Sequence, residues 1–499
     1  METEQGGMGE ETVKALSELI KATAKRFGHN VSIIYDKESL TYSDLSRKIN
    51  IFAGYLLNNG INYQDKVAVF LSNSPLFIIA FFAIAKIGAI AITLNTNYKE
   101  EELKSYLKGM SVKYFISDVR LKDRCEKAIC GEAINLIIID SKKVSSRLNK
   151  NYHINIRINS EDEVLQQFSS GSTGKPKRVG RNHFNLLSEA KSISKTIGIS
   201  GKDKILCAVP LFHAYGFGSA MLPSIYSGAQ LILLDKFSPR RILNILKKEK
   251  ITIFFGVPYM FSMLADVLMK QKPKMLSLRY CFSAGISLPE EVSKKFYRKF
   301  GVFVRDLYGT SETGCISLNL NKRIETTLNS VGLPIIGTKV KVTLEGANKA
   351  EVGQAGQIAV KTPTCGRWYY IGNTKKTLLK DGYFYTGDIG KKDKRENLYI
   401  LGRKTTFINV AGIKVDPREV EDTLKKYLGI KEVVVVGSPD KLRGEIVKAI
   451  IVSNGRPIDT KNLLNYCREK MANFKIPRIV QFRDRLPKSP LGKILKGYL

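Results

Sequence analysis

The stretch FSSGSTGKPK at residues 168–177 joins hydroxyl side chains and glycines to two lysines. Glycine lets backbone N–H groups turn toward an anion, while Ser, Thr and Lys side chains add donors and positive charge. The spacing differs from the Walker loop, G-x-x-x-x-G-K-[ST]. Taken alone, the run fits a flexible polar surface loop as well as a phosphate-binding loop. The candidate phosphate ligands are Ser169, Ser170, Gly171, Ser172, Thr173, Gly174 and Lys177.

Around this run, short β-branched segments alternate with helical patterns, which is typical of α/β layers. Helices are expected at Pro239–Lys248 and Pro289–Lys299. The predicted strands are Lys66–Leu71, Tyr114–Ser117, Leu136–Ile139, Lys204–Ala208, Gln230–Leu233, Ile253–Phe255 and Tyr280–Ser283.

The apolar stretch Leu76–Thr93 approaches the length of a membrane span. Lys86 lies in its middle, where a bilayer would impose a cost of at least ~2.5 kcal/mol. Gly88 divides the stretch into a helix-length part and a short β-rich part, Ala89–Thr93. The pattern therefore predicts a buried helix followed by a buried parallel strand, and no transmembrane segment.

The pattern changes twice farther along the chain. Between Val331 and Val360, glycines separate short strands, which predicts a small antiparallel, barrel-like region. After Gly402 a compact α+β unit is expected. We therefore predict an α/β fold with a large N-terminal domain, residues 1–402, of layered α/β subdomains plus the barrel-like region. A small mobile α+β C-terminal domain, residues 403–499, follows. Its expected elements are helices Pro417–Tyr427 and Thr460–Lys470 and strands Glu432–Gly437 and Ile446–Val452.

The chain is strongly basic, with 80 Lys and Arg residues against 46 Asp and Glu residues and a formal net charge of +34. Such a field attracts polyanions, although a solvated lysine-rich surface explains it equally well. Seven scattered cysteines without a C-x-x-C pair argue against a disulfide framework or a zinc site. The opening METEQGGMGEE lacks the apolar core of a secretory signal, so a cytoplasmic location is expected.

Six further motifs follow the run at 168–177 in order, and the set closely resembles the signatures of the adenylate-forming superfamily. That superfamily comprises acyl-CoA synthetases, luciferases and peptide-synthetase adenylation domains. Each motif is weak or moderate alone, but seven in order at family spacing make coincidence negligible. One departure is Arg178, where the family usually has glycine. The six motifs are Pro210–Phe217 (PLFHAYGF), Ser283–Gly285 (SAG), Asp306–Glu312 (DLYGTSE), Tyr385–Asp388 (YTGD), Leu401–Arg403 (LGR) and Leu486–Lys493 (LPKSPLGK).

The resemblance implies an ATP site with Mg²⁺. The loop at 169–177 would hold the β- and γ-phosphates, Tyr308 would stack on adenine, and Ser311 would reach the α-phosphate. Glu312, together with Thr173, would hold Mg²⁺, an ion that accepts one carboxylate plus waters and substrate phosphates. The other residues that the resemblance places at the nucleotide are Ser283, Ala284, Gly285, Asp306, Leu307 and Gly309.

The resemblance also assigns the ribose, the hinge and the mobile lysine. Asp388 and Arg403 would contact the ribose, since an ionised carboxylate accepts hydrogen bonds from a vicinal diol. The hinge position is Thr405, where the family usually has Asp or Lys. Lys493 would bridge the acyl carboxylate and the α-phosphate, and His213 would shape the carboxylate site. The loop at 410–414 would face the pantetheine arm of the acceptor thiol.

The implied reaction is ATP-dependent activation of a carboxylic acid followed by thioester formation with coenzyme A. Relatives that activate amino acids usually place an aspartate just after the position of His213, and Ala214–Ala220 contains no acid. A fatty acid is therefore favoured, with an aryl acid as the other neutral-tailed class. The phosphopantetheine of an acidic acyl carrier protein is the main alternative acceptor, because residues 461–499 carry ten basic and two acidic residues. The apolar candidates for the acyl pocket are Phe217, Gly218, Phe255, Val257, Tyr259 and Ile286.

A non-catalytic basic binding protein on the same fold is the alternative from a different class. The retained Lys177, Glu312, Asp388 and Lys493 argue against it. The aromatic residues show no stacking pattern for single-stranded nucleic acid, so no nucleic-acid partner is expected. Peripheral contact with an anionic membrane stays open, because the surface charge is positive.

Overall fold

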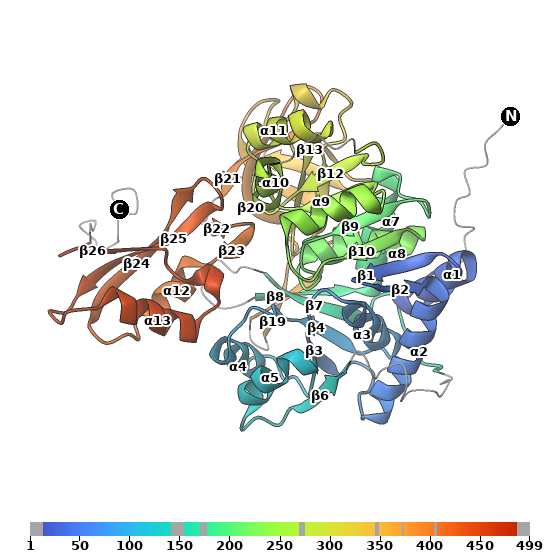
Figure 1. The fold of residues 1–499 in the computed structure, drawn as a ribbon, viewed down its shortest axis with the longest axis horizontal. Coiled ribbons are helices and arrows are strands. Elements are labelled where there is room, and N and C mark those ends of the chain that lie inside the picture. Colours follow the sequence, from blue (N-terminus) through green and yellow to red (C-terminus); the bar gives the residue numbers. More distant parts are fainter. Residues whose placement is uncertain are drawn as a thin grey trace.

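The structure is a computed structural model. It describes residues 13–140, 154–169, 177–268, 275–344, 349–371, 374–403 and 407–486. Figure 1 shows a large lobe of stacked sheets and helices on the right and a small lobe on the left, formed by the C-terminal part of the chain. We use "small lobe" for residues 407–486 and "large lobe" for the described residues before them.

The first layer of the large lobe is a nine-stranded sheet in the order β15-β14-β13-β12-β11-β9-β10-β1-β2. The strands from β1 through β10, β9, β11 and β12 to β13 run parallel, and the others are antiparallel edges. The bounds are β1 Val31–Tyr35, β2 Glu38–Thr41, β9 Lys204–Cys207, β10 Gln230–Leu233, β11 Ile253–Gly256, β12 Tyr280–Ser283, β13 Val304–Thr310, β14 Gly314–Leu318 and β15 Leu333–Pro334.

The second layer is an eight-stranded sheet in the order β19-β18-β8-β7-β4-β3-β5-β6. Its half from β7 to β6 is parallel, and β8, β18 and β19 add antiparallel pairs. The bounds are β3 Lys66–Phe70, β4 Ile90–Thr93, β5 Tyr114–Asp118, β6 Asn135–Ile139, β7 Glu163–Ser169, β8 Lys177–Asn182, β18 Trp368–Ile371 and β19 Thr374–Thr377.

Helices cover these sheets, as expected for parallel strands that are buried on both faces. A π-helical turn, Tyr215–Met221, leads into α8 beside the cavity described below. The helices are α1 Leu16–Phe27, α2 Tyr42–Asn58, α3 Pro75–Lys86, α4 Glu100–Lys108, α5 Lys122–Ile129, α7 His183–Ile197, α8 Leu222–Ser227, α9 Pro239–Lys248, α10 Pro258–Asp266 and α11 Glu290–Phe300.

Helix α3 confirms the prediction for the long apolar stretch. Ser74 caps its first turn by accepting from the Phe77 N–H, with Pro75 at the first helical position. All ten residues from Leu76 to Ala85 are buried. Gly88 then allows the left-handed turn, at φ +72°, that leads into buried β4. Among the described residues, no helix combines the length and apolar content that a membrane crossing needs.

The barrel-like region is a four-stranded antiparallel sheet in the order β16-β17-β20-β21. Val340 and Val342 of β16 and Ile358 and Val360 of β17 form its apolar core with Leu398. The glycine-rich pattern predicts only the first two of these strands. The bounds are β16 Lys339–Thr343, β17 Gly356–Lys361, β20 Phe384–Lys392 and β21 Leu398–Arg403.

The small lobe is a five-stranded sheet with two helices; the sequence predicts both helices and two of the five strands. Its own apolar core joins the sheet to both helices, for example Val435 and Val447 to Val420 and Leu463. The boundary between residues 402 and 403 stays a prediction, because residues 404–406 lie outside the described part of the chain. The elements are β22 Ile408–Val410, β23 Ile413–Val415, α12 Pro417–Leu424, β24 Ile430–Asp440, β25 Gly444–Ser453, α13 Thr460–Lys470 and β26 Ile479–Phe482.

Helix α12 ends at Leu424, so the predicted helix Pro417–Tyr427 is three residues too long. After Lys425, the N–H groups of Lys426 and Tyr427 bond three residues back instead of four. Gly429 then turns the chain at φ +100° into β24. The apolar pattern continues through Tyr427, because this ring packs against the small-lobe core from outside the helix.

Candidate active site

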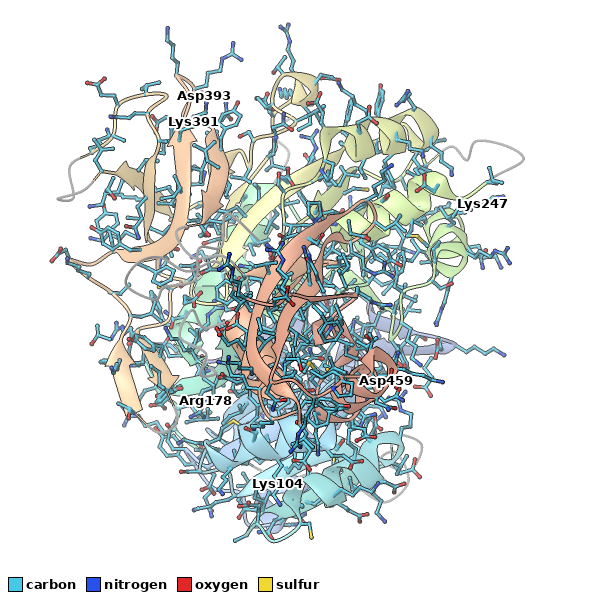
Figure 2. The ribbon with its side chains drawn as sticks, turned by 90° about the vertical axis from the view of Figure 1, so that its left-hand side faces the viewer. Lys104, Arg178, Lys247, Lys391, Asp393 and Asp459 are labelled. Carbon is cyan, nitrogen blue, oxygen red and sulfur yellow. The ribbon has the colours of Figure 1, made fainter. Side chains whose placement is uncertain are left out.

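A cavity of about 400 Å³ lies at the carboxyl ends of the parallel strands of the nine-stranded sheet. Val209, Asp235, Val257 and Ala284 follow β9, β10, β11 and β12, respectively, and all four line it. This is where ligands bind in open α/β sheets. The small lobe closes the other side with residues 411–414. Figure 2 views the molecule from that side, with the small lobe in front of the large lobe.

Seven of the predicted site residues line this cavity. They come from three separate segments, the loop after β9, the turn after β12 and the hairpin between β13 and β14. The parallel register of β9, β11, β12 and β13 brings these segments to one edge of the sheet. The seven are His213, Ala284, Gly285, Leu307, Gly309, Ser311 and Glu312.

His213 is held as a neutral imidazole. Its side chain is accessible from the cavity. The surrounding protein nevertheless desolvates the ring, and this burial, with the nearby charge of Lys414, lowers the pKa of His213 to about 4. Its Nδ1 accepts from the Tyr215 N–H at 3.3 Å. The proton of the neutral ring therefore lies on Nε2, which can donate to a carboxylate oxygen.

Glu312 lies in the turn between β13 and β14. A hydrogen bond from the Thr313 N–H to Thr310 Oγ1, at 3.2 Å, and one from the Gly366 N–H to the Glu312 carbonyl, at 2.9 Å, fix this turn. The described residues contain no cluster of three or more metal-ligating side chains. A single carboxylate at the cavity fits Mg²⁺, which keeps waters and substrate oxygens as its other ligands, and the Mg²⁺ role of Glu312 stays a prediction.

Tyr308 and Asp388, predicted to contact adenine and ribose, are neighbours. The Tyr308 hydroxyl donates to Asp388 Oδ2 at 2.6 Å, from β13 to β20. Asp388 is buried and lies opposite Arg403 in the β20–β21 register. The sequence separates Tyr308 from Asp388 by 80 residues, and the hairpin and the barrel-like sheet bring them together.

Ser283 and Asp306 are register partners on β12 and β13, and both side chains are buried. Burial raises the pKa of Asp306 well above its usual range, opposed by a hydrogen bond from the Leu288 N–H at 3.3 Å. Ser283 Oγ has no hydrogen-bond partner within the described part of the chain. Neither residue lines the cavity, so their contact with a nucleotide stays a prediction.

Several predicted residues lie outside the described part of the chain: Ser170, Gly171, Ser172, Thr173, Gly174, Thr405 and Lys493. For Ser169 and Arg403 only the backbone is described, in β7 and β21. Lys177 begins β8, and its ammonium lies 5.5 Å from the centre of the Tyr369 ring. The roles of all these residues stay predictions.

Arg178, which stands where the family usually has glycine, is a buried structural residue. Its guanidinium donates to Gln166 Oε1 at 2.7 Å and lies over the Tyr370 ring at 5.5 Å. Burial lowers the pKa of Arg178 to about 10, partly offset by Glu163. Figure 2 shows Arg178 in the large lobe, beside the edge of the small lobe. The Arg178 side chain on β8 therefore packs against residues of β7 and β18.

The expected acyl-pocket wall is only partly correct. Of the six apolar candidates, Val257 lines the cavity. Phe217 packs edge-on against Phe81 at 4.7 Å, and Phe255 stacks on Phe282 at 5.4 Å, so both belong to the core. Sequence reasoning instead missed eleven lining residues, which come from strands, helices and loops of the large lobe and from the small lobe. They are Asn95, Asn97, Tyr98, Tyr106, Phe168, Asp235, Phe237, Met260, Glu419, Phe474 and Lys475.

Comparison with known families agrees with this geometry. The family model of AMP-binding enzymes matches residues 20–370, and the model of the AMP-binding enzyme C-terminal domain matches residues 419–493. The chain belongs to the AMP-binding enzyme family. This AMP-binding enzyme is 30% identical to a long-chain-fatty-acid–CoA ligase of Bacillus subtilis, over 97% of the chain and 94% of the relative. It is 29% identical to a feruloyl-CoA synthase of an Amycolatopsis species, over 95% of the chain and 96% of the relative.

Two solved structures differ in how well they superpose on this AMP-binding enzyme. A double mutant of o-succinylbenzoate CoA synthetase from Bacillus subtilis, bound to a product analogue, has a TM-score of 0.88. ATP-bound MatB from Rhodopseudomonas palustris has a TM-score of 0.72. Each is 25% identical to this chain. The first match covers 96% of this chain and 98% of the solved one, and the second covers 97% of this chain and 98% of the solved one.

Proposed function

We propose that this AMP-forming acid–CoA ligase acts on a fatty acid. It joins the acid to ATP as an acyl-adenylate with release of pyrophosphate, and then transfers the acyl group to the thiol of CoA with release of AMP. The observation that carries the proposal is the cavity itself. Its lining combines His213 and Glu312 with the apolar side chains of Val257, Phe237 and Met260, and residues 411–414 of the small lobe complete it.

The adenylation step uses position and charge more than covalent help from the protein. One oxygen of the substrate carboxylate attacks the α-phosphorus of ATP, and the bond to pyrophosphate breaks. Neutral His213 donates a hydrogen bond from its Nε2–H to one carboxylate oxygen and so orients the group, while the other oxygen keeps the electron pair that attacks phosphorus. Glu312 would hold Mg²⁺, which, when bound, neutralises charge on the phosphates. Lys493 supplies a further cation by family resemblance.

The thioester step needs an entry for the acceptor. Ala411, Gly412, Ile413 and Lys414 line the same cavity as His213, so the small lobe forms part of its wall. The thiol sulfur forms a bond to the acyl carbon, and the bond from that carbon to the adenylate oxygen breaks. The ammonium of Lys414 lies near enough to His213 to influence its pKa, which places positive charge at this part of the cavity.

An aryl acid with polar ring substituents is the second candidate. Asn95, Asn97 and Asp235 line the cavity among its apolar groups and can hydrogen-bond to polar ring substituents. Asn95 Oδ1 already accepts from the Asn97 N–H at 2.9 Å, and Asp235 forms an ion pair with Arg120 at 3.5 Å, so both are partly satisfied without substrate. A fatty acid is therefore the first candidate.

Direct detection of the product tests the acid class. Purified protein is given ATP, Mg²⁺, CoA and an equimolar panel of saturated fatty acids of several lengths, hydroxycinnamic acids and amino acids, and acyl-CoA products are identified by mass spectrometry. Fatty acyl-CoA should dominate. Dominant hydroxycinnamoyl-CoA would replace the fatty acid by the aryl candidate, and an aminoacyl product would overturn both.

The salt dependence of acyl transfer tests which acceptor the protein uses. Described residues 461–486 are rich in lysine and arginine, so transfer to an acidic carrier protein should fall steeply between 50 and 500 mM salt, on the order of tenfold or more. Transfer to CoA should change much less over that range. Transfer that occurs only with a carrier protein, and is lost at high salt, would replace CoA as the acceptor.

A further inference from the structure

Three charged side chains meet where the two lobes touch. The Lys475 ammonium lies 2.6 Å from Glu102 Oε1 and 2.6 Å from Glu419 Oε1. Glu102 belongs to α4 of the large lobe, whereas Glu419 belongs to α12 and Lys475 ends the short 3-10 helix Asn473–Lys475, both in the small lobe. We call Glu102, Glu419 and Lys475 the interlobe ion cluster.

The interlobe ion cluster is shielded from water, unlike most ion pairs on a protein surface. The side chains of Lys475 and Glu102 are 4% and 7% exposed. The rings of Tyr98 and Tyr106 stack on each other at 4.6 Å, and the ammonium lies 5.0 Å from the Tyr98 ring. Aromatic faces stabilise a cation, and low exposure strengthens its attraction to carboxylates.

The pKa values agree with this geometry. Burial works against the charge of Lys475, but Glu419, Tyr98 and Glu102 outweigh it, so the pKa of Lys475 is raised. Burial raises the pKa of Glu102, and Lys475 opposes that shift. Each charge therefore depends on its partner, and a lobe movement that separates Lys475 from Glu102 leaves a desolvated charge until water reaches it.

Within the interlobe ion cluster, only one of the two ion pairs crosses between the lobes. The Lys475–Glu419 pair lies within the small lobe and moves with it, whereas the Lys475–Glu102 pair joins the lobes. Glu419 and Lys475 also line the cavity, together with residues 411–414. The Lys475–Glu102 pair therefore forms in the same lobe arrangement in which residues 411–414 line the cavity.

We propose that Glu102 and Lys475 position the small lobe for the thioester step, by holding it where residues 411–414 face the cavity. This role rests on the proposed function, because it assumes two half-reactions. By family resemblance the small lobe turns between the two half-reactions and presents residues 410–414 to the acceptor's pantetheine arm in the second, so the Glu102–Lys475 pair favours that half-reaction.

The variant Glu102→Gln tests this role most directly. It removes the charge that crosses the lobe boundary and leaves the Lys475–Glu419 pair intact. Glu102 Oε2 also accepts from the Lys99 N–H at 3.1 Å at the start of α4. Glutamine can keep that hydrogen bond, so α4 should stay capped. Glu102→Asp keeps the charge on a shorter side chain and should give an intermediate effect.

The neighbouring residue supplies a matched control. Glu101 also pairs across the lobes, with Lys470, but at 3.8 Å and with side chains 64% and 38% exposed. Exposed pairs at this distance contribute little. Glu101→Gln therefore removes the same charge from the same helix and from the same lobe boundary, without touching the buried pair.

The experiment separates the half-reactions. Pyrophosphate release with acid and ATP measures adenylation, and single-turnover transfer from preformed acyl-adenylate to saturating CoA measures thioester formation. Glu102→Gln should slow the transfer at least tenfold, about 1.4 kcal/mol in barrier height, and change pyrophosphate release less than twofold. Glu101→Gln should change neither. Equal losses in both half-reactions, or a raised KM for CoA with an unchanged maximal transfer rate, would overturn the proposal.

Hydrogen exchange without substrates gives a second readout that does not depend on the reaction. Backbone amides of α4 and of Asn473–Lys475 should exchange faster in Glu102→Gln than in Glu101→Gln, because the lobes separate more often. Unchanged exchange would overturn the positioning role even if transfer slowed. A wild-type protein that releases no pyrophosphate with any acid refutes the proposed function instead, and the exchange result still decides whether the pair holds the lobes together.

Discussion

Arg181 and Glu189 form an ion pair at 2.6 Å in which neither side chain is exposed. Glu189 Oε1 also accepts from the Cys315 N–H at 3.2 Å, which ties α7 to the start of β14. A Cβ on Gly314 would lie 2.0 Å from the same carboxylate, so glycine is required there. The pair thus supports the hairpin that carries Glu312. In the sequence, Arg181 and Glu189 are two charges among many, and only the fold reveals that both are buried.

Glu189→Gln should destabilise the protein by roughly 3–5 kcal/mol, because it leaves the Arg181 charge buried without a counter-ion. Unfolding in urea measures this change. The exposed Arg47–Asp44 pair provides the control, and Arg47→Gln, which leaves the hydrogen bonds from Thr41 to Asp44 intact, should cost about 1 kcal/mol or less. A loss for Glu189→Gln no larger than that of the control would contradict the account of this pair.

At the scale of elements, the apolar pattern predicts the sheets well and the contacts between helices poorly. Strand Gln230–Leu233 and helices Pro239–Lys248 and Thr460–Lys470 match their predicted bounds, because alternation, proline and capping residues act locally. The contact between α1 and α7 has no such signal. There the Leu16 N–H, at the start of α1, donates to Nδ1 of His183, the first residue of α7, at 3.3 Å.

His183 makes the α1–α7 contact sensitive to pH. Burial lowers the pKa of His183 to about 4, with a small opposing contribution from Asp162. The unfolded chain binds a proton near pH 6.5 and the folded chain does not, so stability is present above pH 6.5 and is lost as pH falls from 6.5 toward 4. At pH 5 this loss is about 2 kcal/mol.

His183→Asn should remove this contribution, since the Asn Oδ1 can accept from the Leu16 N–H and does not titrate. The difference in unfolding free energy between wild type and variant should shrink by about 2 kcal/mol from pH 7 to pH 5. His29, which is exposed, gives the control variant His29→Asn. A wild type and a His183→Asn variant with parallel stability curves would refute the account.

At the scale of the whole molecule, the lobes approach each other through two glycines. A Cβ on Gly285 would lie 3.1 Å from the Gly412 carbonyl oxygen, and a Cβ on Gly412 would lie 3.1 Å from Val257 Cγ1. Gly285 lies between β12 and α11, and Gly412 connects β22 to β23. The resemblance places Gly285 at adenine and residues 410–414 at the pantetheine arm, and the structure shows both glycines lining one cavity. The resemblance does not predict Tyr106 or Lys475, because their positions follow from how one lobe rests on the other.

Gly412→Val should hinder this approach. Gly455 offers a control in the same lobe, because its φ of +100° is as restrictive as the +88° of Gly412 and nothing lies within 4 Å of its Cβ position. Acyl transfer to CoA should fall tenfold or more in Gly412→Val, while pyrophosphate release stays within about threefold. Gly455→Val shares the backbone strain and should keep both activities. Similar transfer rates in the two variants would contradict the lobe contact.

The central claim, that this chain forms an acyl-adenylate, is tested most directly by pyrophosphate release. The protein is assayed with ATP, Mg²⁺ and single acids from the fatty, aryl and amino acid classes, beside the variant Lys493→Ala. The account predicts release that requires a fatty or aryl acid and falls about a hundredfold or more in the variant. Pyrophosphate release that no carboxylic acid stimulates would contradict the account.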